Sequence, residues 1–275
     1  MITSTANARI RYVRSLQEGK VRRQEQCLVI EGVRLVEEAL QAGIAPRLVL
    51  YSPDLTGTPR GQALLARLEA LPGERWLASE RALKAAADTV TPQGIVAVIP
   101  VPAAPAEIGT MPLVLVLDGL QDPGNLGTIL RSAWAAGAGA VVTTPGTVDP
   151  YNPKAVRAGM GAHFHLALLP DQPWSPIARL VAGRQVLLAE ARGGTPYDQI
   201  AWSQPTALII GSEAHGCGPE AWALATATVS IPLAEGVDSL NAAVAASILL
   251  FEARRSRQVD KGKVDKEARA TSQQS

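Results

Sequence analysis

Residues 113–138 read LVLVLDGLQDPGNLGTILRSAWAAGA, and this stretch decides the fold of the larger part of the chain. It opens with a continuous aliphatic run, which is typical of strands buried on both faces of a parallel sheet. A turn follows at Asp122-Pro123-Gly124, and a helical pattern then covers 125–136. A buried strand that leads through a turn into a helix predicts an α/β domain with a parallel sheet.

The same alternation continues toward the C-terminus. Short apolar runs separated by helix-length segments predict strands at 138–142, 185–190, 206–211 and 227–233, and a closing helix at 239–255. Ligands of parallel sheets bind beyond the carboxyl ends of the strands. Polar residues in the loops after these strands are therefore the first candidates for a functional site.

The first hundred residues form a separate α/β pattern. Residues 28–42 begin extended and turn helical at the glycine, strands are predicted at 48–52 and 93–100, and helices are predicted at 60–71 and 80–88. Four prolines in 100–112 indicate a semi-rigid linker. We expect domains at 1–99 and 113–257, joined by the linker 100–112, and a disordered basic tail at 258–275, where apolar residues are lost.

Composition excludes several classes of protein. Hydrophobic residues make up 47% and charged residues 19% of the 275 residues, which is typical of a globular protein and not of a disordered one. No apolar run approaches the roughly 20 residues that span a bilayer, and the N-terminus lacks a signal-peptide pattern. We expect a cytoplasmic protein without a membrane partner.

The net charge of +1 hides an uneven distribution. Both ends of the chain are basic and the middle is acidic, a pattern that favours a polyanion held at the periphery. Solvation of helices and tails is an equally good explanation from charge alone. If the polyanion is RNA, its candidate contacts in the N-terminal segment are Arg9, Arg11, Arg14, Arg22 and Arg23.

Three loops carry candidate chemistry. In the first, Asn125 is expected to cap the helix and Arg131 to project about two turns along it, where a guanidinium suits a phosphate. The second is IIGSEAHGCGPE at 209–220. In the third, Ser239 is expected to cap a helix that carries Asn241 in its first turn. Polar loops beyond strands of one parallel sheet should converge on a shared pocket.

Two alternative readings of these loops are weaker. Residues 216–221 fit the dinucleotide pattern G-x-G-x-x-A, but that pattern needs its first glycine directly after the strand, and here five residues separate Ile210 from Gly216. Histidines are the usual acid–base catalysts, yet His163 and His165 alternate as in a strand and are expected to be structural or surface residues. His215 lies in the second loop and is not expected to act.

The stretches DPGNLGTILR, IIGSEAHGCGPE and IPLAEGVDSLNAAVAAS resemble, in this order and spacing, the three motifs of the SpoU (TrmH-like) branch of the SPOUT methyltransferases. The likeness covers Leu113 to Arg257. Residues 1–99, with EGVRLVEEAL and TPQGIVAV, resemble the L30e-like substrate-binding domain of many members. The resemblance implies an α/β trefoil-knot domain, a homodimer that builds each site from two chains, and S-adenosylmethionine as methyl donor without a metal.

The implied reaction is 2′-O-ribose methylation of RNA, with 23S ribosomal RNA expected as substrate. A transfer-RNA 2′-O-methyltransferase and a non-catalytic RNA-binding ribosome-assembly factor remain open as alternatives. The resemblance assigns catalysis to Asn125, Arg131, Glu213, Ser239 and Asn241. The donor is expected on main-chain groups of Leu208, Ile210, Gly211, Ile231, Leu233 and Leu240, because apolar side chains offer no hydrogen bonds.

Overall fold

The computed structural model describes residues 1–89, 92–103, 108 and 110–272, with side chains as far as 259. The chain divides into two compact units. The first contains Met1–Ala103 together with Asp149–His165, and the second contains Ala104–Val148 together with Leu166–Ser275. We call them the N-terminal unit and the C-terminal unit. Part of the predicted linker, 104–107 and 109, lies outside the described residues.

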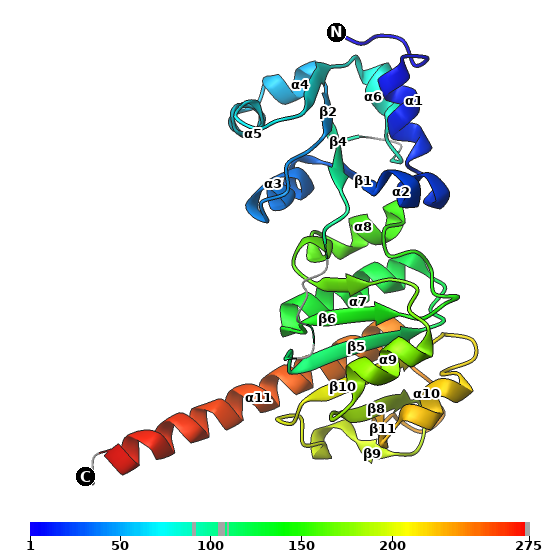
Figure 1. Cartoon of the computed structure of the whole chain (residues 1–275), viewed down its shortest axis with the longest axis vertical. Coiled ribbons are helices and arrows are strands. Elements are labelled where there is room, and N and C mark those ends of the chain that lie inside the picture. Colours follow the sequence, from blue (N-terminus) through cyan, green and yellow to red (C-terminus); the bar gives the residue numbers. More distant parts are fainter. Residues whose placement is uncertain (90–91, 104–107, 109, 273–275) are drawn as a thin grey trace. The chain divides into compact units, whose positions relative to one another are not determined.

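The N-terminal unit is built on a mixed four-stranded sheet (Figure 1). Its strand order is β1 (Cys27–Glu31), β4 (Ile95–Pro100), β2 (Leu48–Tyr51) and β3 (Glu74–Leu77). Only the β2 and β3 pair is parallel. The helices of this unit are α1 (Ala8–Ser15), α2 (Gly19–Glu25), α3 (Val33–Gln41), α4 (Pro53–Thr56), α5 (Pro59–Glu69), α6 (Glu80–Ala86), α8 (Pro153–Gly159) and the 3-10 turn η1 (Ala162–Phe164).

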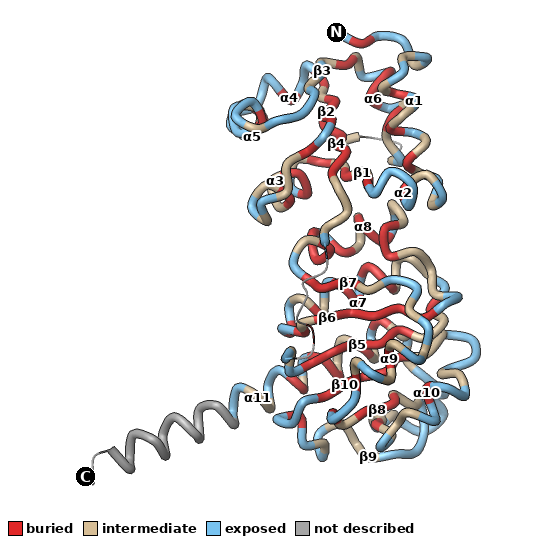
Figure 2. Tube along the Cα trace, in the orientation of Figure 1, coloured by how far each residue is buried: buried red, intermediate tan, exposed pale blue. Residues whose placement is uncertain are grey.

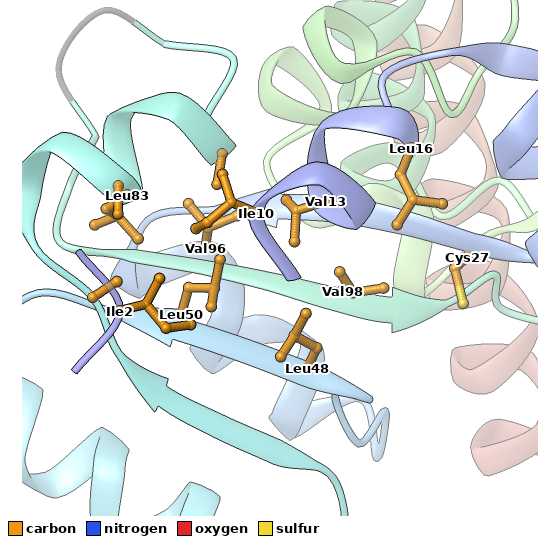
Figure 3. Close-up of a cluster of buried hydrophobic side chains, with 13 residues drawn as sticks. Ile2, Ile10, Val13, Leu16, Cys27, Leu48, Leu50, Leu83, Val96 and Val98 are labelled. Carbon is orange, nitrogen blue, oxygen red and sulfur yellow. The ribbon is translucent and has the colours of Figure 1, made fainter. Parts of the chain in front are cut away.

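An apolar cluster holds α1 and α6 against one face of this sheet. Figure 3 shows Ile10 and Val13 of α1, and Leu16 directly after it, in one cluster with side chains of β2 and β4 such as Leu50 and Val98. Polar side chains begin the helices that carry these residues. For example, the Asn7 Oδ1 atom accepts a hydrogen bond from the Arg9 N–H at 2.9 Å.

The segment Asp149–His165 belongs to the N-terminal unit, although the sequence placed it within the second domain. Specific polar contacts hold it there. The Arg22 guanidinium lies 2.5 Å from the Asp149 carboxylate, and His165 Nε2 lies 2.8 Å from Glu38 Oε1. Apolar patterning could not reveal these contacts, because they join charged residues more than a hundred positions apart.

The C-terminal unit is a seven-stranded sheet in which all neighbouring strands are parallel, as the sequence predicted. Its strand order is β7 (Ala167–Leu169), β6 (Ala140–Thr143), β5 (Leu113–Asp118), β10 (Thr206–Gly211), β8 (Gln185–Glu190), β11 (Ala227–Ser230) and β9 (Thr195–Pro196). Figure 2 shows β5, β6 and β10 buried along most of their length. The aliphatic runs therefore form the centre of the sheet.

Helices cover both faces of this sheet (Figure 1). On one face, α9 (Trp174–Val181) and α10 (Pro219–Leu224) contribute Ile177, Val181 and Ala221 to an apolar cluster with the strands. On the other face, α7 (Pro123–Ala136) packs against α11 (Ala242–Ser272). The 3-10 turn η2 (Tyr197–Gln199) follows β9.

Both predicted helix caps in this unit are wrong. Asp122, and not Asn125, caps α7, since its Oδ1 atom accepts from the Asn125 N–H at 2.7 Å. Asn241, and not Ser239, caps α11, since its Oδ1 atom accepts from the N–H groups of Ala243 and Val244 at 2.9 and 3.3 Å. Asp, Asn and Ser are all good caps, so the sequence alone does not choose among neighbours.

Three other boundaries differ from the prediction. Strand β11 ends at Ser230 and not at 233, because Pro232 cannot donate to a strand ladder. Residues 162–164 form a 3-10 turn and not a strand. The backbone of α11 stays helical to Ser272, where the sequence predicted a disordered tail, because a polar segment rich in Lys, Glu, Arg and Ala has high helix propensity.

Candidate active site

The three motif loops leave the sheet at its carboxyl edge. In the pairing of β5 with β10, Asp118 lies opposite Gly211, so the first two loops begin side by side. In the pairing of β11 with β8, Ser230 lies opposite Glu190, and the third loop begins there. The expected convergence of the loops is therefore confirmed, and its cause is the register of the parallel strands.

A cavity of about 420 Å³ opens at this edge, within the range of about 300–1,000 Å³ that is usual for ligand sites. Its apolar surface includes Val229, Ala245 and Leu249, and its polar rim includes Ser212 and Glu213. An apolar floor with polar groups at its rim suits a ligand that has both an aromatic and a charged part. We call this space the edge cavity.

Five of the six residues expected to hold the donor line the edge cavity, namely Ile210, Gly211, Ile231, Leu233 and Leu240. Leu208 does not, because it lies three residues before the end of β10, where it is completely buried. The cavity is also lined by Ala189, Glu190 and Ala191, which the sequence analysis missed. The signal was available, since Glu190 is the last residue of a predicted strand.

Three of the residues assigned to catalysis form a hydrogen-bonded chain. Asn125 Nδ2 donates to Glu213 Oε1 at 2.7 Å, and Asn241 Nδ2 donates to Asn125 Oδ1 at 3.1 Å. Each residue comes from a different motif loop. The chain therefore fixes the three loops relative to one another, and we call it the rim chain.

Ser239 and Arg131 are not part of the rim chain. Ser239 lines the edge cavity and is exposed. Arg131 is exposed on α7 and is not among the residues that line the edge cavity. Within the described part of the chain, no residue forms a hydrogen bond or ion pair with its guanidinium, and the Glu213 carboxylate instead accepts from Asn125 and Gln121.

Asp118 was also missed, and it organises the second loop. Its Oδ2 atom accepts from the Gly218 N–H at 2.7 Å, and its Oδ1 atom accepts from the Thr144 hydroxyl at 2.9 Å. Burial raises the pKa of the neighbouring Cys217 thiol to about 12, and the nearby Asp118 and Glu190 carboxylates raise it further. Cys217 therefore remains a neutral thiol and cannot serve as a nucleophile.

Only one of the histidines is deeply buried. His163 Nε2 lies 2.8 Å from the Pro150 carbonyl oxygen, and burial lowers the pKa of its imidazole to about 4. His163 and the ion-paired His165 both lie in the N-terminal unit, which agrees with the structural role predicted for them. His215 is exposed in the second loop, where its backbone N–H donates to Ser212 Oγ at 3.1 Å.

The five arginines expected to contact RNA fall into two groups. Arg11, Arg14 and Arg23 are exposed, and Arg9 lies over the Trp76 ring at 4.1 Å while pairing with Glu74 at 2.6 Å. Arg22 is a correction. It is only 4% exposed, and it donates to the Leu16 and Gln17 carbonyl oxygens as well as to Asp149, so it is a structural residue.

Neither a membrane-spanning helix nor a metal-binding cluster occurs among the described residues. No described helix has the length and apolar character needed to cross a membrane. Across the same part of the chain, no three His, Cys, Asp or Glu side chains gather as a metal ion would require.

Comparisons with known proteins agree with this geometry. Residues 112–251 match the sequence model of the SpoU rRNA Methylase family, and residues 7–97 match that of the MRM3-like substrate binding domain. The 23S rRNA (guanosine(2553)-2'-O)-methyltransferase RlmP of Bacillus subtilis is 36% identical over 92% of this chain and 98% of its own length. Mitochondrial rRNA methyltransferase 3A of Danio rerio is 33% identical, and this chain spans only 64% of its length.

Solved structures show the same architecture. The AdoMet-bound rRNA methyltransferase from Sinorhizobium meliloti superposes with a TM-score of 0.82 at 32% identity, covering 92% of this chain and 97% of the other. The SpoU methyltransferase AviRb from Streptomyces viridochromogenes, in complex with AdoMet, gives a TM-score of 0.80 at 30% identity, covering 92% and 100%. The chain belongs to the SpoU rRNA methylase family of RNA methyltransferases, whose methyl donor is S-adenosyl-L-methionine.

Proposed function

We propose that this protein transfers a methyl group from S-adenosyl-L-methionine to a ribose 2′-hydroxyl of large-subunit ribosomal RNA. The observation that carries the proposal is the edge cavity, whose lining residues Glu213 and Asn241 belong to a hydrogen-bonded chain that joins all three motifs. The similar Bacillus subtilis enzyme, which matches nearly end to end, is named for a guanosine 2′-oxygen of 23S rRNA. That RNA is therefore the substrate to try first.

The edge cavity has the chemistry that the donor needs. Gly211, Ile231 and Leu240 can offer backbone groups to its adenine and methionine parts, and the apolar floor can receive the base. The Glu190 carboxylate can accept hydrogen bonds from the ribose hydroxyls or the ammonium group. When bound, the donor supplies an electrophilic methyl on a sulfonium, so the chain itself must orient the attacking oxygen.

Arg131 and the rim chain are suited to position the acceptor. A guanidinium stays protonated in proteins, so Arg131 binds the RNA phosphate and orients the hydroxyl instead of removing its proton. Asn125 is held by both Glu213 and Asn241, which leaves its amide in one orientation beside the cavity. Ser239 and Asn241 order the third loop at the cavity rim.

We also propose a homodimer in which Arg131 of one chain serves the edge cavity of its partner. Arg131 does not line the cavity of its own chain. Val244 and Phe251, each 48% exposed, lie seven residues apart on α11 and so share one face of that helix. An exposed apolar face on a helix that packs against α7 is a suitable place for a second copy.

Complementation tests this arrangement. Arg131→Ala and Gly211→Ala chains, each far less active than wild type when assayed alone at a low donor concentration, should regain about a quarter of wild-type activity after mixing and refolding. Half of the dimers would then be mixed, and each mixed dimer would have one intact site. No recovery, together with a monomeric mass in light scattering, would contradict a shared site.

The activity itself is tested with labelled S-adenosyl-L-methionine and unmodified 23S rRNA, with transfer RNA in a parallel reaction. Wild type should methylate the ribosomal RNA, and Arg131→Ala should lose at least about a hundredfold in rate, the usual scale for a group that orients or stabilises the reacting atoms. Arg179→Ala is the control, because Arg179 is an exposed helical arginine outside the three motifs and outside the lining of the edge cavity. Donor and RNA binding without transfer would favour the non-catalytic assembly factor, and transfer only to tRNA would replace the substrate.

The cytoplasmic location remains a prediction of the sequence analysis, and the trefoil knot remains a prediction that rests on the family resemblance.

A further inference from the structure

A second cavity, of about 410 Å³, lies in the N-terminal unit and has no part in the edge cavity. It opens beside the first turn of α3 and is lined by Gly32, Arg34, Leu35, Gln93, Arg157 and Met160, among others. We call it the α3 cavity. All of these residues belong to the same compact unit.

The α3 cavity is where the two recognisable N-terminal stretches meet. The Gly32 N–H donates to the Ile95 carbonyl oxygen at 3.0 Å, and a Cβ atom on Gly32 would lie only 2.7 Å from Gln93 Oε1. Gly32 also has a φ of +95°, which disfavours any other residue. Because Gly32 has no side chain, the Gln93 amide can reach the cavity wall.

The segment Asp149–His165 supplies the opposite wall. Arg157 lies in the last turn of α8 and is fixed by an ion pair with Asp88 at 2.5 Å. Met160 follows as the left-handed C-cap of that helix and is 43% exposed. An exposed, polarisable thioether beside a held guanidinium forms a surface on which a flat ring can rest.

Arg34 is the group of the α3 cavity that can bind an anion, since the Arg157 guanidinium is paired with Asp88. Arg34 is exposed, and no described residue forms a hydrogen bond or ion pair with its guanidinium, although, together with the hydrogen bond from Arg60, its charge helps to lower the pKa of the nearby Glu37 carboxyl. The one carboxylate in the lining, Glu31, is already engaged, because its oxygens accept from the Thr89 hydroxyl and from the Asp88 N–H. Beyond Arg34, the acids of the adjoining hollow are paired as well, Glu37 with Arg60 and Glu38 with His165.

We propose that the α3 cavity binds one unpaired nucleotide of the substrate RNA, an inference that rests on the proposed function. Proteins recognise RNA mainly through unstacked bases that lie on flat or apolar surfaces and present their edges for hydrogen bonding. Leu35 and Met160 receive the base, the Gln93 amide contacts its edge, and Arg34 binds the phosphate. The cavity thereby selects a loop or bulge over a continuous duplex.

The test compares two arginines at equivalent helix positions. Arg34 is the second residue of α3, and Arg81 is the second residue of α6, exposed and outside the cavity. Changing either one to alanine removes one positive charge from the first turn of a helix. Differences between the variants therefore report the cavity and not the overall charge.

The full chain is titrated with unmodified 23S rRNA transcript at several salt concentrations. Arg34→Ala should weaken RNA binding about tenfold and lower the salt slope by about 0.7 to 1, as for one lost phosphate contact, while Arg81→Ala should stay within about twofold. Gln93→Leu should weaken binding without changing the slope. In RNA that carries 4-thiouridine, irradiation should crosslink the peptide containing Met160.

The outcomes separate the cavity from the reaction. If wild type transfers methyl groups but Arg34→Ala and Arg81→Ala match in affinity, slope and KM, the α3 cavity proposal is overturned and the proposed function stands. If wild type binds RNA in an Arg34-dependent way but transfers no methyl group, only the proposed function fails. Absence of RNA binding would also overturn the cavity proposal. So would a result in which Arg34→Ala loses binding of guanosine monophosphate but keeps wild-type affinity for RNA.

Discussion

Replacing Gly211 by alanine should damage donor binding while leaving the rest of the fold in place. Gly211 is the last residue of β10 and lines the edge cavity. A Cβ atom there would lie 2.2 Å from the Gly216 carbonyl carbon and 2.4 Å from the Cys217 nitrogen. These are backbone atoms of a tight loop, in which Ser212 and Gly216 exchange hydrogen bonds at 2.9 and 3.0 Å. The added methyl group can be accommodated only if the loop moves away from the strand.

The size of the effect follows from the cost of overpacking. Forcing an extra methyl group into closely packed atoms costs about 1–3 kcal/mol. In the free protein the loop shifts and so avoids this cost. Donor binding requires the loop to return to its original position in the cavity wall, so the cost then reduces the affinity for the donor. The dissociation constant for S-adenosyl-L-methionine should therefore rise by about 5- to 150-fold.

Gly218→Ala is the matched control. Gly218 lies in the same loop, but a Cβ atom there would meet only the Asp118 and Glu220 side-chain oxygens, at 3.4 and 3.6 Å, which is ordinary contact. Isothermal titration of both variants with S-adenosyl-L-methionine, after circular dichroism has confirmed folding, gives the comparison. Wild-type affinity in folded Gly211→Ala, or an equal loss in both variants, would refute the steric argument.

Three further predictions address the rim chain and the N-terminal unit. Asn125→Asp should lower kcat/KM at least about tenfold at pH 8, because the new carboxylate repels that of Glu213. Part of the loss should be recovered near pH 5, where the two carboxylates can share a proton. A mutant-to-wild-type ratio of kcat/KM that does not change between pH 5 and pH 8 would count against the rim chain. His163 has its pKa lowered by burial to about 4, so the unfolded state binds a proton below about pH 6.5 that the folded state does not. The stability that neutral His163 contributes is thus complete above about pH 6.5 and falls as the pH drops, by about 2 kcal/mol at pH 5. In denaturant titrations, the free energy of unfolding of His163→Gln should lack this loss at low pH; the same pH dependence in His163→Gln and wild type would contradict the prediction. Arg22→Met should lower the free energy of unfolding by about 2–3 kcal/mol, since it removes contacts to two buried carbonyl groups and to Asp149, whereas Arg23→Met, on the exposed side of α2, should have no measurable effect.

The sequence alone determined the class of the fold and the location of its chemistry. Aliphatic runs such as 113–117 favour a strand that is buried on both faces of a sheet, and that preference is local. Motif spacing then placed polar loops after β5, β10 and β11, where any parallel sheet collects them. For this reason most of the residues expected at the donor site do line the edge cavity.

The tertiary structure alone decided which of several equivalent side chains performs each task. Asp122 and Asn241 cap their helices because the backbone enters each helix at those residues, a choice that depends on strand length and loop path. Arg22 has the same chemistry as Arg23, yet only Arg22 meets an acid 127 positions away. Contacts of this kind depend on through-space distance, which periodicity along the chain does not encode.

The α3 cavity illustrates the same division. The sequence marked 31–40 and 91–98 as recognisable pieces, but nothing in their patterns indicated that they face a third segment from the middle of the chain. Strand pairing of β1 with β4 brings Gly32 to Gln93, and side-chain ion pairs bring Arg157 and Met160 to them. Local sequence specifies the elements through burial and hydrogen bonding of near neighbours, whereas the sites arise where long-range packing joins those elements.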